Sequence, residues 1–322
     1  GDNDSIVSSN VGGNVFGVYV AGDNDSFVGD RFVWDGLVLA GPYYEVVAND
    51  TVNGRPLVFL YDASNVTVSH AGEVIAIDSR GVKVVGVNVS YASAGVQFWD
   101  VNDSIIEDVV AFGNVFGVNI TGSHDSIVSS NVSYSWYGVN ITGSYDSVVN
   151  STVSHDGYGV NITGYGDSII SSTVSNNTFG VYVAGDNNSV VNSTVTYNIW
   201  YGVNITGSHD SILNSTVDYN GYGVDLYNDS GTLITGNIIS NNGQCGLYMQ
   251  GSRGDLIYNN LFNNTINVCI ESGYAYWNVS LRPGRNIVGG DVIGGNAWLS
   301  PNGTGFSQVT PPLPNDPYIC DK

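Results

Sequence analysis

A segment with a period of 21 to 23 residues repeats along most of this chain. Each copy holds a glycine, a short apolar alternation, a Gly/Asp/Ser turn and two further apolar positions. The glycines are Gly95, Gly117, Gly138, Gly159, Gly180, Gly202, Gly223 and Gly246. The period is too short for a helical hairpin and the copies lack helix formers, so the repeat predicts a solenoid built from β-strands.

Three apolar columns appear when the copies are aligned. In GVNIT, Val118 and Ile120 alternate with Asn119 and Thr121, as in a strand with one buried face. The second column comprises Ile127, Val148, Ile169, Val190, Ile212, Leu233 and Leu256, and the third comprises Val132, Val153, Val174, Val195, Val217, Ile238 and Leu261. Three inward columns per copy predict three short strands per coil, which is an all-β parallel β-helix with coils about 4.8 Å apart.

The same alignment predicts the domain organisation. We expect one β-helix over residues 1–282, with irregular coils at 37–94 and regular coils at 95–267, followed by a cap and Pro-rich tail at 283–322. The residues before the glycines predict an aromatic ladder: Phe16, Phe116, Tyr137, Tyr158, Phe179, Tyr201 and Tyr222. Asn119, Asn140 and Asn161 fall in consecutive coils and predict a hydrogen-bonded polar ladder.

The charge balance excludes whole classes of partner. The 322 residues carry a formal net charge of -21 with only 8 Lys and Arg, none of them between Lys83 and Arg253. Nucleic acid is therefore not expected as a partner. Anionic membranes and polyuronates are disfavoured by the same repulsion, and no apolar run is long enough to insert in a membrane.

A column of acids precedes the second strand. It comprises Asp4, Asp25, Asp103, Asp125, Asp146, Asp167, Asn188 and Asp210. Stacked carboxylates repel, so they either bind Ca²⁺ or accept local backbone N–H bonds in Asx turns. We expect the turn role, with Asp125, Asp146 and Asp167 as the Ca²⁺ candidates.

The repeat offers little support for a copper site or a catalytic site. His124 and His209 occupy one column four coils apart and cannot share a copper ion, so no cofactor is expected beyond the possible Ca²⁺. The regular coils offer no paired acids and no base, so we predict no catalytic residues. Trp99, Trp136 and Trp200 are candidates for stacking on sugar rings.

The sequons indicate an exported glycoprotein, and three cysteines lie near the C-terminus. The glycosylation candidates are Asn24, Asn65, Asn88, Asn150, Asn192, Asn214, Asn228, Asn278 and Asn302. Cys245, Cys269 and Cys320 are the disulfide candidates, and because their number is odd one is left over, with the pairing open. We expect an extracellular or cell-surface location with the signal peptide removed or upstream.

The coils and both flanking segments resemble a known family. TVNGRPLVFLYDASNVTV with AGEVIAID is similar to an entry module, and IVGGDVIGGNAWLSPNGTGFSQ is similar to a closing motif, of the NosD-type right-handed parallel β-helix family common in archaeal surface proteins. The resemblance implies a single right-handed helix. Pro311, Pro312 and Pro314 replace an acidic loop of many relatives, so a calcium role from that loop does not transfer.

Two functions follow from these features. GDNDSIVSSNV starts part-way through a coil, which predicts an open first coil that a second copy could cover, unless the chain is a fragment of a longer protein. The main hypothesis is a non-enzymatic extracellular structural glycoprotein, either a cell-surface protein or a head-to-tail filament subunit. The alternative is a carbohydrate-binding or carbohydrate-processing β-helix.

Overall fold

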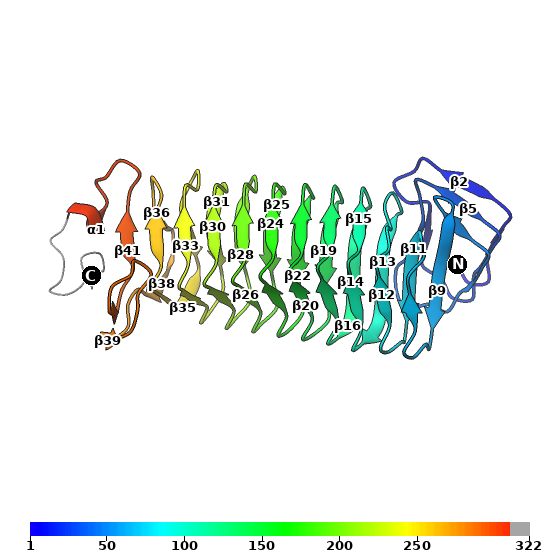
Figure 1. Cartoon of the computed structure of the whole chain (residues 1–322), viewed down its shortest axis with the longest axis horizontal. Helices are drawn as coiled ribbons and strands as arrows, with labels where there is room; N and C mark the ends of the chain where they lie inside the picture. Colours follow the sequence, from blue (N-terminus) through cyan, green and yellow to red (C-terminus); the bar gives the residue numbers. More distant parts are fainter. Residues whose placement is uncertain (310–322) are drawn as a thin grey trace. The chain divides into compact units, whose positions relative to one another are not determined.

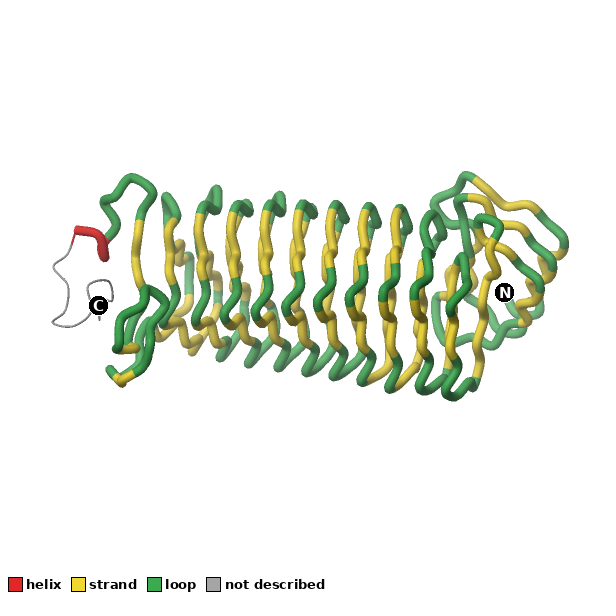
Figure 2. Tube along the Cα trace, in the orientation of Figure 1, coloured by secondary structure: helices red, strands yellow, loops and turns green. Residues whose placement is uncertain are grey.

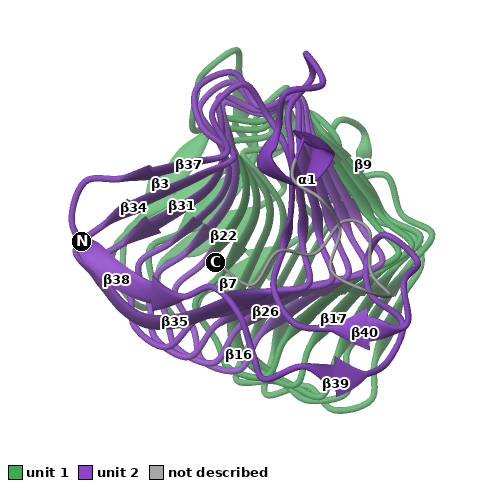
Figure 3. Ribbon diagram, turned by 90° about the vertical axis from the view of Figure 1, so that its left-hand side faces the viewer, with its two compact units in different colours: residues 1–161 green, residues 162–322 purple. Residues whose placement is uncertain are grey.

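The computed structural model describes residues 1–309, and the chain divides into two compact units, residues 1–161 and 162–322 (Figure 3). Each unit is a right-handed parallel β-helix in which three short strands per coil form three parallel sheets (Figure 1). The predicted tail and Cys320 fall outside the described residues. Within residues 1–309 the one helix is α1 (Phe306–Val309), so none of the described helices could cross a bilayer.

Unit 1 contains the first half of the regular coils. Sheet 1 consists of β9 (Arg55–Tyr61), β11 (Glu73–Ile77), β13 (Ala94–Asn102), β16 (Phe116–Ser123) and β19 (Tyr137–Ile141). Sheet 2 consists of β10 (Thr67–Val68), β12 (Lys83–Val85), β14 (Ile105–Glu107), β17 (Ser126–Val128) and β20 (Ser147–Val149). Sheet 3 consists of β15 (Val110–Phe112), β18 (Asn131–Ser133) and β21 (Thr152–Ser154). Strand β22 (Tyr158–Ile162) contains the boundary between the units.

Unit 2 repeats this arrangement. Its sheet 1 consists of β25 (Phe179–Val183), β28 (Tyr201–Ile205), β31 (Tyr222–Tyr227), β34 (Leu247–Gln250) and β37 (Val268–Ile270). Sheet 2 consists of β23 (Ser168–Ile170), β26 (Ser189–Val191), β29 (Ser211–Leu213), β32 (Leu233–Thr235), β35 (Ser252–Tyr258) and β38 (Gly273–Tyr276). Sheet 3 consists of β24 (Thr173–Ser175), β27 (Thr194–Thr196), β30 (Thr216–Asp218), β33 (Ile238–Ser240), β36 (Leu261–Asn263) and β41 (Ala297–Leu299). Strands β39 (Arg282–Pro283) and β40 (Val292–Ile293) form an antiparallel pair.

The first 52 residues of unit 1 form a smaller stack of three coils. Its strands are β1 (Ser5–Val7), β4 (Ser26–Val28) and β7 (Val46–Ala48); β2 (Asn10–Gly12), β5 (Arg31–Val33) and β8 (Thr51–Val52); and β3 (Val18–Val20) and β6 (Leu37–Leu39). Two buried side chains, Ser93 just before β13 and Gln97 within it, hydrogen-bond to the backbone of this stack. Ser93 Oγ accepts from the N–H of Gly36 (2.9 Å), and Gln97 Nε2 donates to the carbonyl of Leu37 (2.8 Å).

The second and third predicted core columns are confirmed up to Ile212 and Val217, and are wrong by one residue beyond them. Ile234 and Ile257 are the buried residues of the second column, and Ile239 and Phe262 those of the third, where we expected Leu233, Leu256, Ile238 and Leu261. The cause is one extra residue in the coil. Ile205 pairs with Leu226, whereas Ser208 pairs with Ser230. The second paired residue therefore follows the first by three positions in one coil and by four in the next. A shift by one residue exchanges the two faces of a strand.

The aromatic and Asn ladders are confirmed within the units. Phe116 stacks on Tyr137 (5.4 Å between ring centroids) and Tyr201 on Tyr222 (5.5 Å), whereas Phe16 contacts Tyr19 edge-on instead. Asn140 Nδ2 donates to Asn119 Oδ1 (2.7 Å), and Asn161 continues this ladder. These bonds join the outward amides of three successive coils.

Each coil turns at three corners, which Figure 2 shows as loops between the strands. A residue with a left-handed backbone marks each corner and an inward polar side chain follows it, as in His124-Asp125, Ser129-Ser130 and Tyr134-Ser135. The inward residues, at positions 125, 130 and 135, are five apart because a three-residue strand and a two-residue corner alternate. We name these positions corners A, B and C.

The inward corner residues form three hydrogen-bonded ladders. The N–H of Ser104 donates to Asp125 Oδ1 (2.8 Å) at corner A, the N–H of Ser130 to Ser151 Oγ (3.1 Å) at corner B, and the N–H of Ser135 to Asp156 Oδ1 (2.6 Å) at corner C. The predicted acid column is therefore a backbone-bonded ladder, but its bonds join neighbouring coils instead of closing Asx turns. Asp103 was wrongly included, since Ser104 occupies that position and Asp103 is paired with Arg80 (2.7 Å).

Cys245 and Cys269 form a disulfide in unit 2 with a Cα–Cα distance of 6.1 Å. It joins residues 24 apart in neighbouring coils. We expect Cys245→Ser to lower the free energy of unfolding of unit 2 by about 3 kcal/mol, because the cross-link no longer restricts the unfolded chain. Thermal unfolding with and without a reductant measures this: the reductant should destabilise only the wild type, and an equal response of the variant would contradict the prediction.

Candidate functional site

A cavity of about 230 Å³ lies in unit 1 where the small N-terminal stack meets sheet 1. Its lining residues are Trp34, Val52, Asn53, Arg55, Gly72, Asn88, Ser90 and Tyr91, which we call the unit 1 groove. The Trp34 and Tyr91 rings lie 6.3 Å apart and are 69% and 49% exposed. The groove therefore presents two aromatic faces beside amide, hydroxyl and guanidinium groups.

A two-residue hairpin positions the polar groups of the groove. Asn53 and Gly54 both have a positive φ and join the antiparallel strands β8 and β9, as the Asn-Gly pair favours. Asn53 Oδ1 accepts from the N–H of Trp34 (2.8 Å), and its Nδ2 donates to the carbonyl of Tyr91 (2.9 Å). Arg55 Nη1 donates to the carbonyl of Asn88 (2.6 Å). Sequence reasoning missed this site, although the Asn-Gly signal was present.

An aromatic row continues from the groove along corner C of unit 1. Tyr91 contacts Phe112 (5.3 Å), Phe112 contacts Tyr134 (4.8 Å), and Tyr134 stacks on His155 (4.8 Å, 6° between the ring planes). Tyr91, Tyr134 and His155 are exposed left-handed corner residues. Coil stacking thus places an aromatic ring on each successive coil beside the groove.

The three predicted sugar-stacking tryptophans have different surroundings within their units. Trp99 packs against the core of the N-terminal part of unit 1 and is only partly exposed. Trp136 in unit 1 is 62% exposed and follows Tyr134 of the aromatic row by two residues. Trp200 is 53% exposed in unit 2. The sequence missed Trp34, which lines the groove.

All nine predicted glycosylation sites are exposed. Six of them are also left-handed corner residues: Asn24, Asn65, Asn150, Asn192, Asn214 and Asn228. Asn tolerates this conformation better than most residues, so the corners explain why Asn recurs there. Their modification stays a prediction.

The Ca²⁺ candidates Asp125, Asp146 and Asp167 are all buried. Burial raises the pKa of Asp125 to about 8 and that of Asp146 to about 6. The hydrogen bonds that their carboxyl groups accept from backbone N–H groups lower the pKa, but by less than burial raises it. Asp125 Oδ1 and Asp146 Oδ1 each accept a hydrogen bond from a backbone N–H of the preceding coil, whereas Ca²⁺ takes several oxygen ligands around one point. Within residues 1–309 no three His, Cys, Asp or Glu side chains form a cluster.

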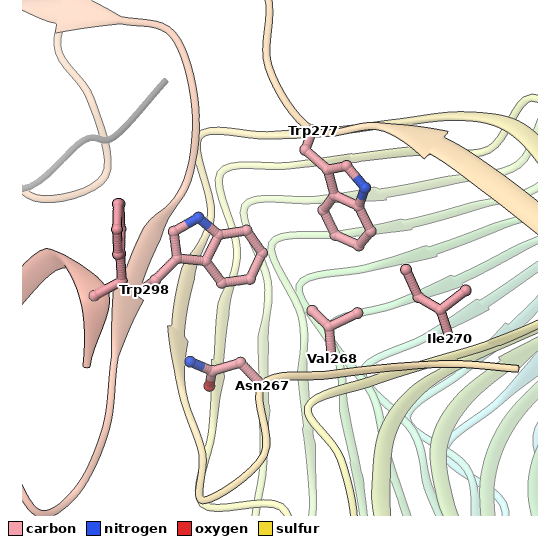
Figure 4. A pocket seen from close by; sticks show the side chains of 6 residues that line it. Asn267, Val268, Ile270, Trp277 and Trp298 are labelled. Carbon is pink, nitrogen blue, oxygen red and sulfur yellow. The ribbon is translucent and has the colours of Figure 1, made fainter. Parts of the chain in front are cut away.

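A second cavity, of about 520 Å³, lies in unit 2 (Figure 4). Its described lining residues are Asn267, Val268, Ile270, Trp277, Trp298 and Phe306. Trp298 stacks on the buried Phe262 with 4.7 Å between the ring centroids, and Asn267 Nδ2 donates a hydrogen bond to the carbonyl of Leu299 (2.7 Å). This cavity is an apolar extension of the unit 2 core with little polar chemistry to orient a ligand.

Several of the residues that could ligate copper are engaged elsewhere. Cys245 and Cys269 are bonded to each other, and Met249 is fully buried in the core. His124 and His155 stack on tyrosines at different corners of unit 1. Copper needs imidazole or sulfur ligands that converge, and these residues do not provide such a set.

Comparisons with known proteins identify the family. No curated protein shows significant sequence similarity to the chain. Among solved structures, the A-module of mannuronan C-5 epimerase AlgE4 from Azotobacter vinelandii is similar over 85% of this chain and 87% of its own length, with 13% identity and a TM-score of 0.54. A tailspike protein of E. coli bacteriophage HK620 is similar over 85% of this chain and 58% of its own, with 12% identity and a TM-score of 0.52.

These two likenesses support the fold. The family model described as "Periplasmic copper-binding protein (NosD)" matches residues 61–210 and 148–303. Within residues 1–309 no three His, Cys, Asp or Glu side chains form a cluster, so this part of the chain does not fit the copper of that description. The resemblance seen in the sequence is confirmed: the chain belongs to the NosD family of parallel β-helix proteins.

Proposed function

We propose that this protein is an exported carbohydrate-binding β-helix that holds a glycan in the unit 1 groove. The observation that carries the proposal is the pair of exposed rings, Trp34 and Tyr91, beside the polar groups of Asn53 and Arg55. Aromatic faces pack on the apolar faces of sugar rings, while amide and guanidinium groups bond hydroxyls. The aromatic row extends this surface for a longer chain of sugars.

The proposed ligand is a neutral glycan. The net charge of -21 opposes a polyuronate, and Arg55 is the one charged residue among the described groove residues. These lining residues include no Asp or Glu, so they lack the carboxyl pair that glycoside hydrolysis requires. The epimerase module, by its name, acts on mannuronan, which is itself a polyuronate, so it gives a precedent for a carbohydrate ligand on this fold but not for its charge.

We expect Trp34→Ala and Tyr91→Ala each to weaken glycan binding at least tenfold, because each removes a stacking face. A glycan array selects the ligand, and calorimetry measures its affinity. Trp200→Ala is the matched control, since it removes an exposed tryptophan from unit 2. If no glycan binds, or if only Trp200→Ala weakens binding, the groove is not the site.

Export is proposed on two grounds. The Cys245–Cys269 disulfide is typical of proteins that fold in an oxidising compartment, and the family description is periplasmic. N-linked glycans on the exposed sequons and a cell-surface location belong to the same proposal. Mass spectrometry of the native protein before and after deglycosylation tests the sequons.

End-to-end association stays a prediction from the sequence. At the small stack, β1 pairs with β4 and Val7 is exposed, so a second copy could add a strand there. Electron microscopy of the native protein would show filaments, and a population of separate particles at high concentration would contradict them.

A further inference from the structure

One pair of positions at corner A has a fixed spacing in the regular coils. A glycine precedes the inward acid by three residues, as in Gly207 and Asp210 of unit 2. A Cβ built on Gly207 would lie 2.6 Å from Asp210 Oδ2. A side chain at the glycine position would therefore point at the carboxylate.

Two successive coils of unit 2 depart from this pattern. Ser208 pairs with Ser230 and Ser230 with Arg253, so Asp229 and Ser252 occupy the glycine position. Ser211 pairs with Leu233 and Leu233 with Leu256, so Thr232 and Asp255 occupy the acid position. Here the extra residue between Leu226 and Ser230 changes the path of the chain. These two coils therefore place four oxygen-bearing side chains at the glycine and acid positions, whereas two regular coils place only their two acids there.

These four side chains are sealed from solvent and poorly satisfied. Asp229, Thr232, Ser252 and Asp255 are at most 2% exposed. Asp255 Oδ1 accepts from the N–H of Thr232 (3.0 Å). Both carboxyl oxygens of Asp229, Oδ2 of Asp255 and the two hydroxyl oxygens have no well-formed hydrogen bond.

The four groups nevertheless face one another. Burial raises the pKa of Asp229, and the side chains of Ser252, Thr232 and Asp255 oppose this shift, in that order of size. Burial and the charge of the Asp229 carboxyl group raise the pKa of Asp255. Neither acid has an ion-pair partner among residues 1–309. Unsatisfied buried oxygens are costly, and the cost is removed if a cation lies between them.

Carboxylate and hydroxyl oxygens are hard ligands, and Ca²⁺ accepts six to eight of them in flexible geometry. Mg²⁺ demands a stricter octahedron and keeps its waters, for which a sealed cluster leaves little room. We propose that Asp229, Thr232, Ser252 and Asp255 form an interior Ca²⁺ site that ties the two coils together. The site is separate from the Ca²⁺ candidates of the regular column, and it is independent of the glycan groove of unit 1.

The test starts from the full chain, freed of metal with EDTA at pH 5 and returned to pH 7.5. Calorimetric titration with CaCl₂ should show one ion per chain, and Ca²⁺ should raise the melting temperature more than Mg²⁺ does. The control is the double variant Asp229→Gly with Thr232→Asp, which restores the sequence pattern of the regular coils. It should bind Ca²⁺ at least tenfold more weakly and lose the Ca²⁺-dependent rise in melting temperature.

Ser252→Gly restores the glycine of the second coil alone. It is the variant to test if the double variant does not fold. It should also weaken Ca²⁺ binding. Absence of Ca²⁺ binding to the wild type would overturn the proposal and leave the two acids as a proton-sharing pair. Unchanged Ca²⁺ affinity in a folded variant would overturn it as well, because the ion would then bind elsewhere.

Discussion

Raising the pH from 4 to 9 is expected to lower the melting temperature of this protein by roughly 10 °C or more, since about 1.4 kcal/mol accompanies each pKa unit and 1 kcal/mol shifts a unit of this size by about 2–4 °C. The effect comes from the corner ladders of unit 1. Burial raises the pKa of Asp125 and of Asp156 to about 8 in each case, from 3.8. Circular dichroism melting curves at unit intervals of pH measure it.

The sign follows from the direction of these shifts. Both carboxyl groups bind a proton more tightly in the folded protein than in the unfolded chain. Their contribution to stability is complete below about pH 4, and it is lost as the pH rises through about 8. Above that pH, folding must keep two ionised carboxylates away from water.

Asp125→Asn supplies the control, because an amide cannot ionise but keeps the acceptor oxygen. Asn188 already plays this role in unit 2, where its Oδ1 accepts from the N–H of Asp167 (2.8 Å). We expect the variant to be less sensitive to pH than the wild type. A stability that rises toward pH 9 would show that the buried acids are not protonated.

Gly202→Ala is expected to destabilise unit 2 by about 3 kcal/mol or more, because overpacking a filled site forces backbone shifts. A Cβ at Gly202 would lie 2.6 Å from the carbonyl oxygen of Gly223, 2.7 Å from Asn220 Nδ2 and 2.8 Å from Val217 Cγ1. Two of these atoms belong to the corner C ladder and the sheet 3 core. The repeating glycine therefore serves close approach and not an unusual backbone angle.

Gly243→Ala is the matched control in the same unit. The nearest atoms to a Cβ there are backbone oxygens 3.8 Å away, which is an ordinary contact. Its effect should stay within about 0.5 kcal/mol. Chemical denaturation compares the two variants, and equal losses would mean that the glycines matter through chain flexibility alone.

The regular coils could be predicted from the sequence because their pattern is local and repeated. Val118, Ile120, Ile127 and Val132 show their burial by alternation and by recurrence in the next coil. The prediction was wrong where one residue was added, between Leu226 and Ser230. Alternation gives the faces of a strand but not the coil in which an insertion is absorbed.

The corner B and C ladders were missed although their signal was in the sequence. The five-residue spacing of Asp125, Ser130 and Ser135 recurs as Asp146, Ser151 and Asp156. Serine, asparagine and aspartate read as surface turn residues by composition. Only their alignment as three inward columns shows that their side chains, and not water, accept the hydrogen bonds of backbone N–H groups.

The candidate sites depended on tertiary structure. The unit 1 groove joins Trp34 to Tyr91, which are far apart in the sequence, and no periodicity connects them. The small N-terminal stack has the same local pattern as the regular coils, so its contact with Ser93 and Gln97 could not be seen in advance.

The sequence by itself determined the family, the β-helical fold and the three apolar columns, because stacking makes each coil repeat the same local requirements. The tertiary structure decided which insertion shifts the register, which aromatic rings meet beside a polar groove, and which four oxygens gather at Asp229 and Asp255. Those outcomes depend on contacts between residues that the repeat does not relate.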